Sequence, residues 1–178
     1  MLIGIISDTH DNLTGLQKAI QIFKDHKIEM LIHCGDWNSL YALEFFDKEM
    51  KDLRIPIKSV VGNNTGDVKR ILMNNNKIQN PIEWSEKVTL SLDIDGKKTI
   101  IYHGDDYAIL DALIESQRYD IIFTGHTHSP RNEVVGKTLV LNPGSTSYAR
   151  ESKIISEASI AIYNSKTKKA EKIGRAHV

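Results

Sequence analysis

The chain has 178 residues, and its 23 lysines and arginines are balanced by 23 aspartates and glutamates. This length fits one domain of ordinary size, which buries roughly 70% of its unfolded surface and needs no disulfides. A neutral total argues against a protein that wraps nucleic acid by bulk charge. The single cysteine, Cys34, cannot form an intrachain bridge, and no apolar stretch approaches the ~20 residues of a membrane helix. We therefore expect a cytoplasmic protein without a membrane anchor.

The first part of the chain alternates between short apolar runs and amphipathic stretches. Buried parallel strands are expected at Leu2–Ser7, Met30–His33 and Pro56–Val61. Apolar residues at helical spacing predict helices over Leu16–Phe23, Leu40–Phe46 and Asp67–Met73. This alternating order predicts parallel strands joined by right-handed crossovers.

The pattern then changes toward paired strands. A hairpin is expected from Val88–Asp93 and Thr99–Tyr102, with its turn at Asp95-Gly96. Further along we expect a helix at Ala108–Ser116, a strand at Asp120–Phe123, and two strand pairs, Asn132–Val135 with Thr138–Leu141 and Ser159–Tyr163 with Ala170–Ile173. We therefore predict that a parallel sheet gives way to an antiparallel one. A single domain should span residues 1–173, followed by a flexible or artificial tail at 174–178, where His177 receives no role.

Five polar clusters each lie just after a predicted strand. They are Asp8-Thr9-His10, Gly35-Asp36, Gly62-Asn63-Asn64, His103-Gly104 and Gly125-His126-Thr127-His128. In α/β sheets, ligand sites assemble at the carboxyl ends of strands. These clusters are therefore predicted to meet at one edge of the fold, although they are far apart in sequence.

The residue types in the clusters suit divalent metal ions. Carboxylate oxygens and imidazole nitrogens together bind Mn²⁺, Fe²⁺, Zn²⁺, Ni²⁺ or Co²⁺, and the lack of cysteine argues against a structural zinc site. If the chain stays extended, residues two apart point to the same side, so Asp8 would converge with His10, and His126 with His128. The two oxygens of Asp36 could bridge two ions. Glycines that permit tight turns accompany the clusters at Gly35, Gly62, Gly104 and Gly125.

The ordered motifs resemble those of the calcineurin-like metallophosphoesterase superfamily. Its signature reads D-x-H, G-D, G-N, a later histidine and G-H-x-H, and the five clusters match it in that order. The segments GIISDTHDN, IHCGD, GNN and LNPGSTS resemble the small single-domain branch of bacterial and archaeal phosphodiesterases, the YfcE-like group. The resemblance runs from residue 2 to about residue 163.

The resemblance implies both a fold and a reaction. The fold is a four-layer α/β/β/α sandwich, in which two mixed β-sheets are flanked by helices. Asp8, His10, Asp36 and His128 would hold one ion, and Asp36, Asn63, His103 and His126 the other. A hydroxide shared by the two ions would attack the phosphorus of a small phosphoester, most plausibly a phosphodiester. We expect two Mn²⁺ ions, with Ni²⁺, Fe²⁺, Zn²⁺ and Co²⁺ as alternatives, and relatives of this branch suggest a homodimer.

Three positions depart from the wider superfamily. Asn64 stands where many relatives carry a histidine that helps to protonate the leaving group, and an amide cannot act as a general acid. Thr65 and Asp105 also replace residues that are common in relatives. Asn64 and His103 are the candidates for a direct role in catalysis, Asn64 through a hydrogen bond to a phosphate oxygen.

Other readings remain open from the sequence. His33 could support a metal ligand from behind or be a purely structural histidine. The turn Asn142–Ser145 is expected to be structural rather than a substrate contact, and Arg150 to be solvated rather than bound to phosphate. Two alternative functions are a non-catalytic protein-interaction scaffold of the Vps29 type and a domain that senses nucleotide or metal without turnover.

Overall fold

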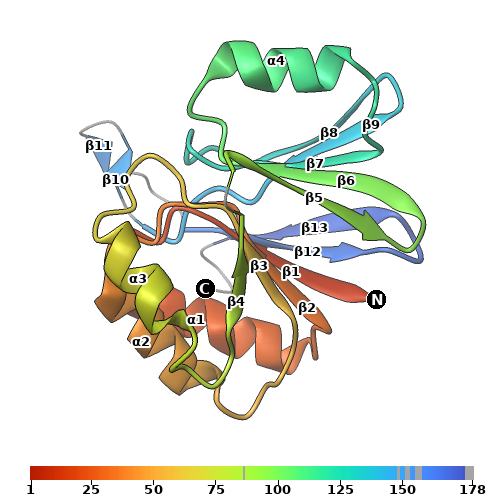
Figure 1. The fold of residues 1–178 in the computed structure, drawn as a ribbon. Coiled ribbons are helices and arrows are strands. Elements are labelled where there is room, and N and C mark those ends of the chain that lie inside the picture. The colour runs from red at the N-terminus through yellow and green to blue at the C-terminus, as the bar shows by residue number, and fades with distance from the viewer. Residues whose placement is uncertain (86, 148, 151–152, 155–157, 175–178) are drawn as a thin grey trace.

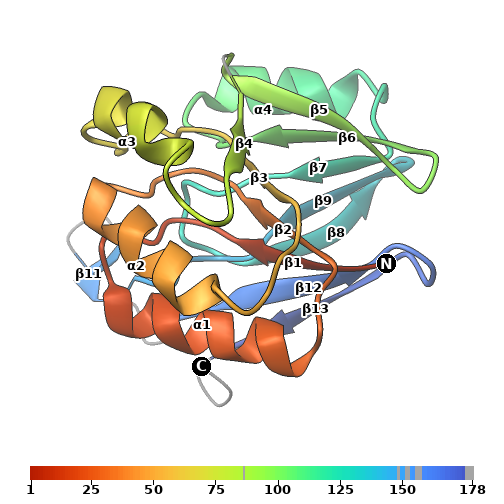
Figure 2. The same cartoon turned by 60° about the horizontal axis from the view of Figure 1, so that its bottom comes forward.

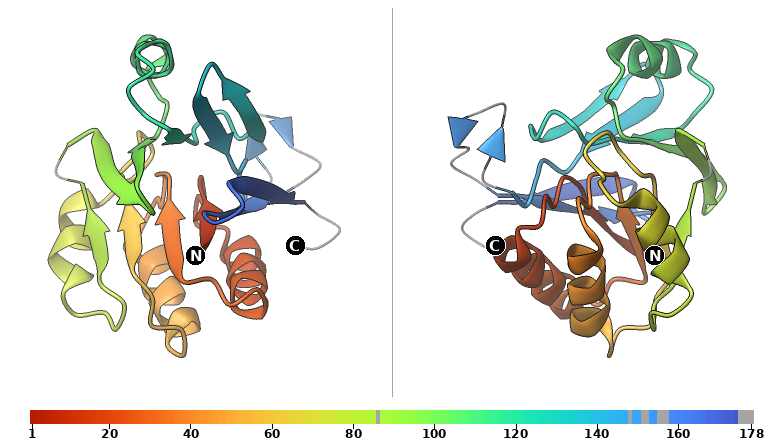
Figure 3. Two further views of the ribbon diagram at one scale, coloured as in Figure 1. Left: turned by 90° about the vertical axis from the view of Figure 1, so that its right-hand side faces the viewer. Right: turned by 60° about the vertical axis from the view of Figure 1, so that its left-hand side comes forward.

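In the computed structural model, two mixed β-sheets pack face to face and carry helices on their outer faces (Figure 1). The structure describes residues 1–85, 87–147, 149–150, 153–154 and 158–174. Seen edge-on, the order of layers is helices, sheet, sheet, helix (Figure 3). This confirms the α/β/β/α sandwich that the motifs implied.

The first sheet has six strands in the order β13-β12-β1-β2-β3-β4. Their bounds are β13 Lys169–Ile173, β12 Ile160–Asn164, β1 Leu2–Ile6, β2 Met30–His33, β3 Ile57–Ser59 and β4 Ile82–Trp84. Strands β1, β2 and β3 run parallel, as predicted, β4 pairs parallel with β3, and the β12–β13 hairpin joins β1 antiparallel. The outer face is covered by α1 Leu13–Asp25, α2 Leu40–Met50 and α3 Val68–Asn75 (Figure 2).

The second sheet has five strands in the order β5-β6-β7-β9-β8 and a parallel centre. Their bounds are β5 Thr89–Ile94, β6 Lys97–Tyr102, β7 Ile121–Phe123, β9 Thr138–Asn142 and β8 Arg131–Val135. Strands β6, β7 and β9 are parallel neighbours, and only β5 and β8 pair antiparallel at the edges. The prediction of an antiparallel second half is therefore wrong for the centre of this sheet. The helix α4 Tyr107–Glu115 supplies the crossover that parallel pairing of β6 with β7 requires.

Short elements escaped the sequence analysis. The strand β4 has three residues, and the small hairpin of β10 Ala149–Arg150 with β11 Lys153–Ile154 has two in each strand. Runs this short show no period by which a strand can be recognised. The side chain of Arg150 and the residues 175–178, including His177, lie outside what the structure describes.

Alternate residues of the central strands pack into two different hydrophobic cores. Ile3 and Ile5 of β1 pack between the sheets with Phe123 of β7, whereas Ile6 packs against the helices. In the second sheet, Ile122 points the other way and packs below α4. Because these strands are buried on both faces, their carboxyl ends are held rigidly. No helix among the described residues is long and apolar enough to cross a membrane.

Candidate metal centre

The polar clusters lie on loops that follow β1, β2, β3, β6 and β7, all at the same edge of the sandwich. Backbone hydrogen bonds tie each loop to its neighbour: Asp8 N–H donates to Gly35 O (3.0 Å), and Asp36 N–H donates to Val61 O (3.0 Å). In the second sheet, Gly125 N–H donates to His103 O (2.8 Å). The sheet hydrogen bonding therefore continues into the loops and fixes their spacing.

The backbone at the candidate ligands is not extended. Positive φ angles occur at Asp8 (54°), His10 (43°), Asp36 (64°), His126 (65°) and His128 (54°). This left-handed conformation is uncommon for residues with a side chain, and such strain concentrates at functional sites. The side chains of Asp8 and His10 do meet, but the extended geometry that we assumed is wrong. His126 and His128 turn instead toward different partners.

Asp8 lies at the centre of a first group of donor atoms. Its Oδ1 is buried and, among the described residues, accepts no hydrogen bond of normal geometry. It faces three imidazole Nε2 atoms, at 3.2 Å for His128, 3.7 Å for His10 and 4.0 Å for His103. The Nε2 atoms of His10 and His128 are 3.0 Å apart. A buried oxygen surrounded by nitrogen donors is the environment of a cation.

Asn63 organises a second group beside the first. Its Oδ1 lies 2.9 Å from His103 Nε2 and 3.0 Å from His126 Nδ1. The Nδ1 atom of His103 lies 2.8 Å from the carbonyl oxygen of Cys34, and this contact fixes the orientation of the imidazole ring. Such backbone support of the distal ring nitrogen is typical of histidines that bind metals.

Asp36 lies between the two groups. Its Oδ2 is 3.6 Å from His10 Nε2 and 3.3 Å from His103 Nε2. Asn64 holds this carboxylate in place: its backbone N–H donates to Oδ1 (2.7 Å) and its Nδ2 donates to Oδ2 (3.2 Å). The predicted catalytic side chain of Asn64 therefore binds Asp36 here, which leaves its second amide hydrogen for another acceptor.

His33 is buried and contacts none of the candidate ligands through a hydrogen bond among those described. Gly35 N–H donates to its Nδ1 (3.1 Å), and its Nε2 lies 3.4 Å from the hydroxyl of Thr9. Its ring stacks on Trp37, with centroids 3.9 Å apart. Gly35 precedes Asp36, and Thr9 lies between Asp8 and His10, so His33 supports both ligand loops from behind.

Charges in the cluster shift the pKa values of its members. Burial opposes ionisation of Asp8, yet the imidazoles of His10 and His128 bring the pKa of its carboxyl well below the ordinary value. Burial likewise opposes the charge of His103, but Asp36 and Asp8 raise its pKa. For His33 burial dominates and lowers the pKa to about 3, although Asp8 and Asp36 act in the opposite direction. The carboxylates are thus ionised and ready to bind a cation at neutral pH.

Several supporting residues were missed or underweighted by the sequence analysis. Ser7 Oγ donates to Asp8 Oδ2 (2.5 Å), and Ser145 Oγ donates to the carbonyl oxygen of Asp8 (2.7 Å). Asn142 Nδ2 donates to Gly125 O (2.6 Å) and to Thr127 Oγ1 (3.1 Å). The late segment that contains Asn142 and Ser145 is therefore structural, as expected, but it holds both the first and the last ligand loops. The segment LNPGSTS was the signal that could have located it.

Two glycines are required by close approach rather than by turns alone. A Cβ at Gly125 would collide with Ser7 Oγ, and one at Gly62 would collide with Asp36 Oδ1. Gly62 also has a φ of 84°, whereas Gly125 has no such positive angle. Both loops can reach the cluster only without a side chain at these positions.

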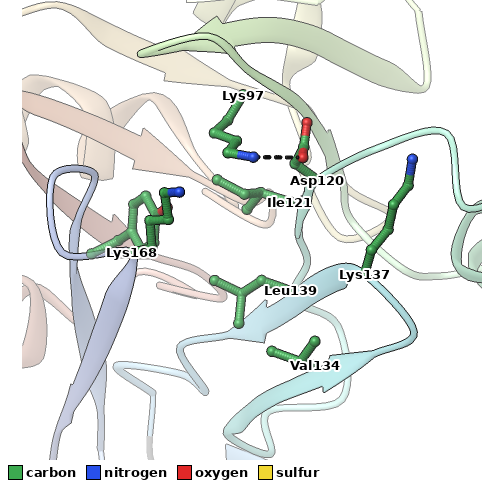
Figure 4. Close-up of a pocket in the computed structure, with 8 residues that line it drawn as sticks. Lys97, Asp120, Ile121, Val134, Lys137, Leu139 and Lys168 are labelled. Atoms are coloured by element: carbon green, nitrogen blue, oxygen red, sulfur yellow. Dashed lines mark hydrogen bonds and ion pairs between the residues drawn. The ribbon is translucent and has the colours of Figure 1, made fainter.

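A separate cavity of about 150 Å³ opens at the starts of the parallel strands, at the other end from the cluster (Figure 4). Lys97 at the start of β6 forms an ion pair with Asp120 there (2.9 Å), over an apolar floor that includes Leu139. No candidate ligand lines it. The cluster is therefore distinct from this cavity.

The donor set fits divalent metal ions. Asp8, His10 and His128 can offer ligand atoms within 4.8 Å of one another, and so can Asp8, Asp36 and His103. Oxygen and imidazole donors without sulfur match Mn²⁺ and its neighbours in the first transition row.

The chain is similar to known proteins over most of its length. Residues 1–168 match the calcineurin-like phosphoesterase superfamily domain. The chain is 41% identical over 152 residues to the phosphodiesterase MJ0936 of Methanocaldococcus jannaschii, which covers 81% of this chain and 83% of that protein. The solved structure of an archaeal phosphodiesterase superposes with a TM-score of 0.81 at 35% identity, over 98% of this chain and 100% of the other.

A more distant likeness concerns the fold alone. The zinc complex of Vps29 from Entamoeba histolytica has a TM-score of 0.64 at 19% identity, over 98% of this chain and 99% of the other. The extent of the family match and the identity to the archaeal relative settle the family. The chain belongs to the calcineurin-like phosphoesterase superfamily.

Proposed function

We propose that this protein is a phosphodiesterase that holds two divalent ions, Mn²⁺ or a close neighbour, and hydrolyses a small phosphodiester. Family membership makes it a metal-dependent hydrolase of phosphoester bonds. The observation that carries the finer proposal is the position of Asp36, whose Oδ2 lies within 3.6 Å of His10 and 3.3 Å of His103. One carboxylate that faces both donor groups supports a pair of ions.

The candidate ligands form two sets, one for each ion. Asp8, His10, Asp36 and His128 would hold one ion, and Asp36, Asn63, His103 and His126 the other. When bound, the ions would activate a water between them and neutralise the phosphoryl oxygens. Asn64 and His33 act as positioning residues, because Asn64 fixes the Asp36 carboxylate and His33 fixes the loops on either side.

The reading as a non-catalytic scaffold has less support. The likeness to Vps29 extends to the fold, whereas all seven candidate ligands are present here and the side chain of each lies within hydrogen-bond or ion-pair distance of another. The choice of Mn²⁺, a cytoplasmic location, one domain over residues 1–173 and a homodimer stay predictions.

Metal removal tests the proposal. Protein treated with a chelator should lose hydrolysis of an activated aryl phosphodiester, and Mn²⁺ or Ni²⁺ should restore it. Asp36→Asn should reduce the restored rate by more than about 100-fold, because it weakens the carboxylate that faces both groups. Asp52→Asn, a change at an exposed aspartate beyond α2, is the matched control. An enzyme that shows no turnover with any divalent metal would refute the proposal.

A further inference from the structure

Tyr107 is an exposed aromatic residue that contacts a candidate metal ligand. Its side chain is 57% exposed, and its ring meets the imidazole of His126 edge to face, with centroids 6.1 Å apart and an angle of 64° between the planes. Single exposed aromatic residues are common on protein surfaces. Contact with His126 places this one beside the candidate metal centre.

The backbone around Tyr107 is unusually well fixed. The buried Tyr102 hydroxyl accepts a hydrogen bond from Asp106 N–H (2.8 Å) and donates to Asp106 O (3.3 Å). The Asp106 carboxylate in turn caps α4 by accepting from Ala108 N–H (2.9 Å) and Ile109 N–H (3.3 Å). Tyr107 therefore extends from a rigid helix start. A tyrosine side chain has few rotatable bonds, so it loses little conformational entropy when it binds a ligand.

A second feature adjoins the neighbouring histidine. A cavity of about 100 Å³ is lined by Val61, Gly62, Lys87, Val88, His103 and Asp105. The rings of His103 and His126 are 5.3 Å apart. Val88 is 62% exposed and gives this cavity an apolar wall, while Lys87 and Asp105 give it charges of both signs. The ring of Tyr107 and this cavity thus flank the pair formed by His103 and His126. A phosphodiester has two ester groups, one for each of these two places.

We propose that Tyr107 recognises the substrate by stacking on a flat, unsaturated ring in one of its ester groups, such as a nucleobase. The other ester group would occupy the cavity beside His103. This inference rests on the proposed function, since it assumes that a phosphate binds at the ion pair. A nucleobase presents a π face to the tyrosine ring, whereas a sugar or alkyl group does not. The substrate class is therefore a nucleoside phosphodiester or another aryl phosphodiester.

A binding comparison tests this without turnover. AMP and ribose 5-phosphate carry the same sugar phosphate, and AMP has a base at the position where ribose 5-phosphate has a hydroxyl group. In protein loaded with Mn²⁺, calorimetry should show AMP binding about tenfold more tightly than ribose 5-phosphate. Tyr107→Ala should weaken AMP about tenfold, equivalent to about 1.4 kcal/mol, and change ribose 5-phosphate by less than about twofold. Tyr107→Phe should retain the preference because the ring remains.

Controls separate recognition from a structural role. Ile109→Ala changes an exposed residue of the same helix and should bind both ligands like the unchanged protein. Tyr107→Ala should keep the unchanged stoichiometry and affinity for Mn²⁺. Equal binding of AMP and ribose 5-phosphate, or an equal loss of both in Tyr107→Ala, would overturn the inference. A protein that binds AMP preferentially but hydrolyses no diester would instead refute only the proposed function.

Discussion

Replacing His33 by glutamine should reduce the loss of folding stability that occurs as the pH falls from 7 to 5. In the folded protein, burial lowers the pKa of His33 from the ordinary 6.5 to about 3, so the ring is neutral at pH 5. The unfolded chain takes up that proton below about pH 6.5. Because the folded pKa is the lower one, this stability is fully present above pH 6.5 and is lost as the pH falls toward 3.

The size of the effect follows from the shift. Between pH 7 and pH 5 the unfolded state gains about 2 kcal/mol from protonation of His33, at about 1.4 kcal/mol for each pH unit below 6.5. For a chain of this length, that corresponds to a fall in Tm of about 4–8 °C. His33→Gln removes the titrating group, so the Tm of this variant should fall about 4–8 °C less between pH 7 and pH 5 than the Tm of the unchanged protein.

The assay compares how steeply Tm changes with pH, rather than Tm itself, because the glutamine variant also loses the stacking of His33 on Trp37. Thermal unfolding of chelator-treated protein is followed at pH 7, 6 and 5 for both forms. His103 acts in the opposite sense because its pKa is raised, but it is present in both and cancels in the difference. Parallel curves for His33→Gln and the unchanged protein would refute the reasoning.

Three further predictions concern the site. Gly125→Ala places a Cβ against the Ser7 hydroxyl and should cost about 1–3 kcal/mol in urea unfolding, so an unchanged midpoint would count against the packing described. Asn142→Ala removes the side-chain hydrogen bonds to the carbonyl of Gly125 and to the hydroxyl of Thr127, and should weaken Mn²⁺ binding about 10–100-fold by calorimetry; unaltered affinity would contradict its supporting role. Mn²⁺ at 100 times its Kd should stabilise the protein by about 2.7 kcal/mol, raising Tm by about 5–11 °C, and the rise should largely vanish in Asp36→Asn. If Mn²⁺ does not raise the Tm of the unchanged protein, the folded state does not bind the ion.

Local patterns were enough to locate most of the elements. Apolar runs marked β1 and β2, because strands buried on both faces have no polar side. The parallel centre of the second sheet was missed, since pairing depends on where α4 places β7 relative to β6 and not on the residues of either strand. The three residues of β4 were too few to show a period.

The site shows the same division between composition and geometry. The order of the five clusters after their strands was sufficient to gather the candidate ligands at one edge. It could not show that Asp8, His10 and His128 have positive φ angles, so the extended geometry assumed for them was wrong. Tyr107 gave no signal, because its contact with His126 joins α4 to a loop of the second sheet.

The sequence by itself determined the chemistry of this protein: which donor atoms it carries, and that each cluster of them follows a strand. The tertiary structure alone decided how those donors divide. His126 turns to Asn63 and His128 turns to Asp8, although the two histidines are only two residues apart. The reason is physical. Left-handed backbone angles and the hydrogen bond from Asn142 aim the loop after β7, and the hydrogen bond from Ser145 to Asp8 forms only once both sheets have packed together.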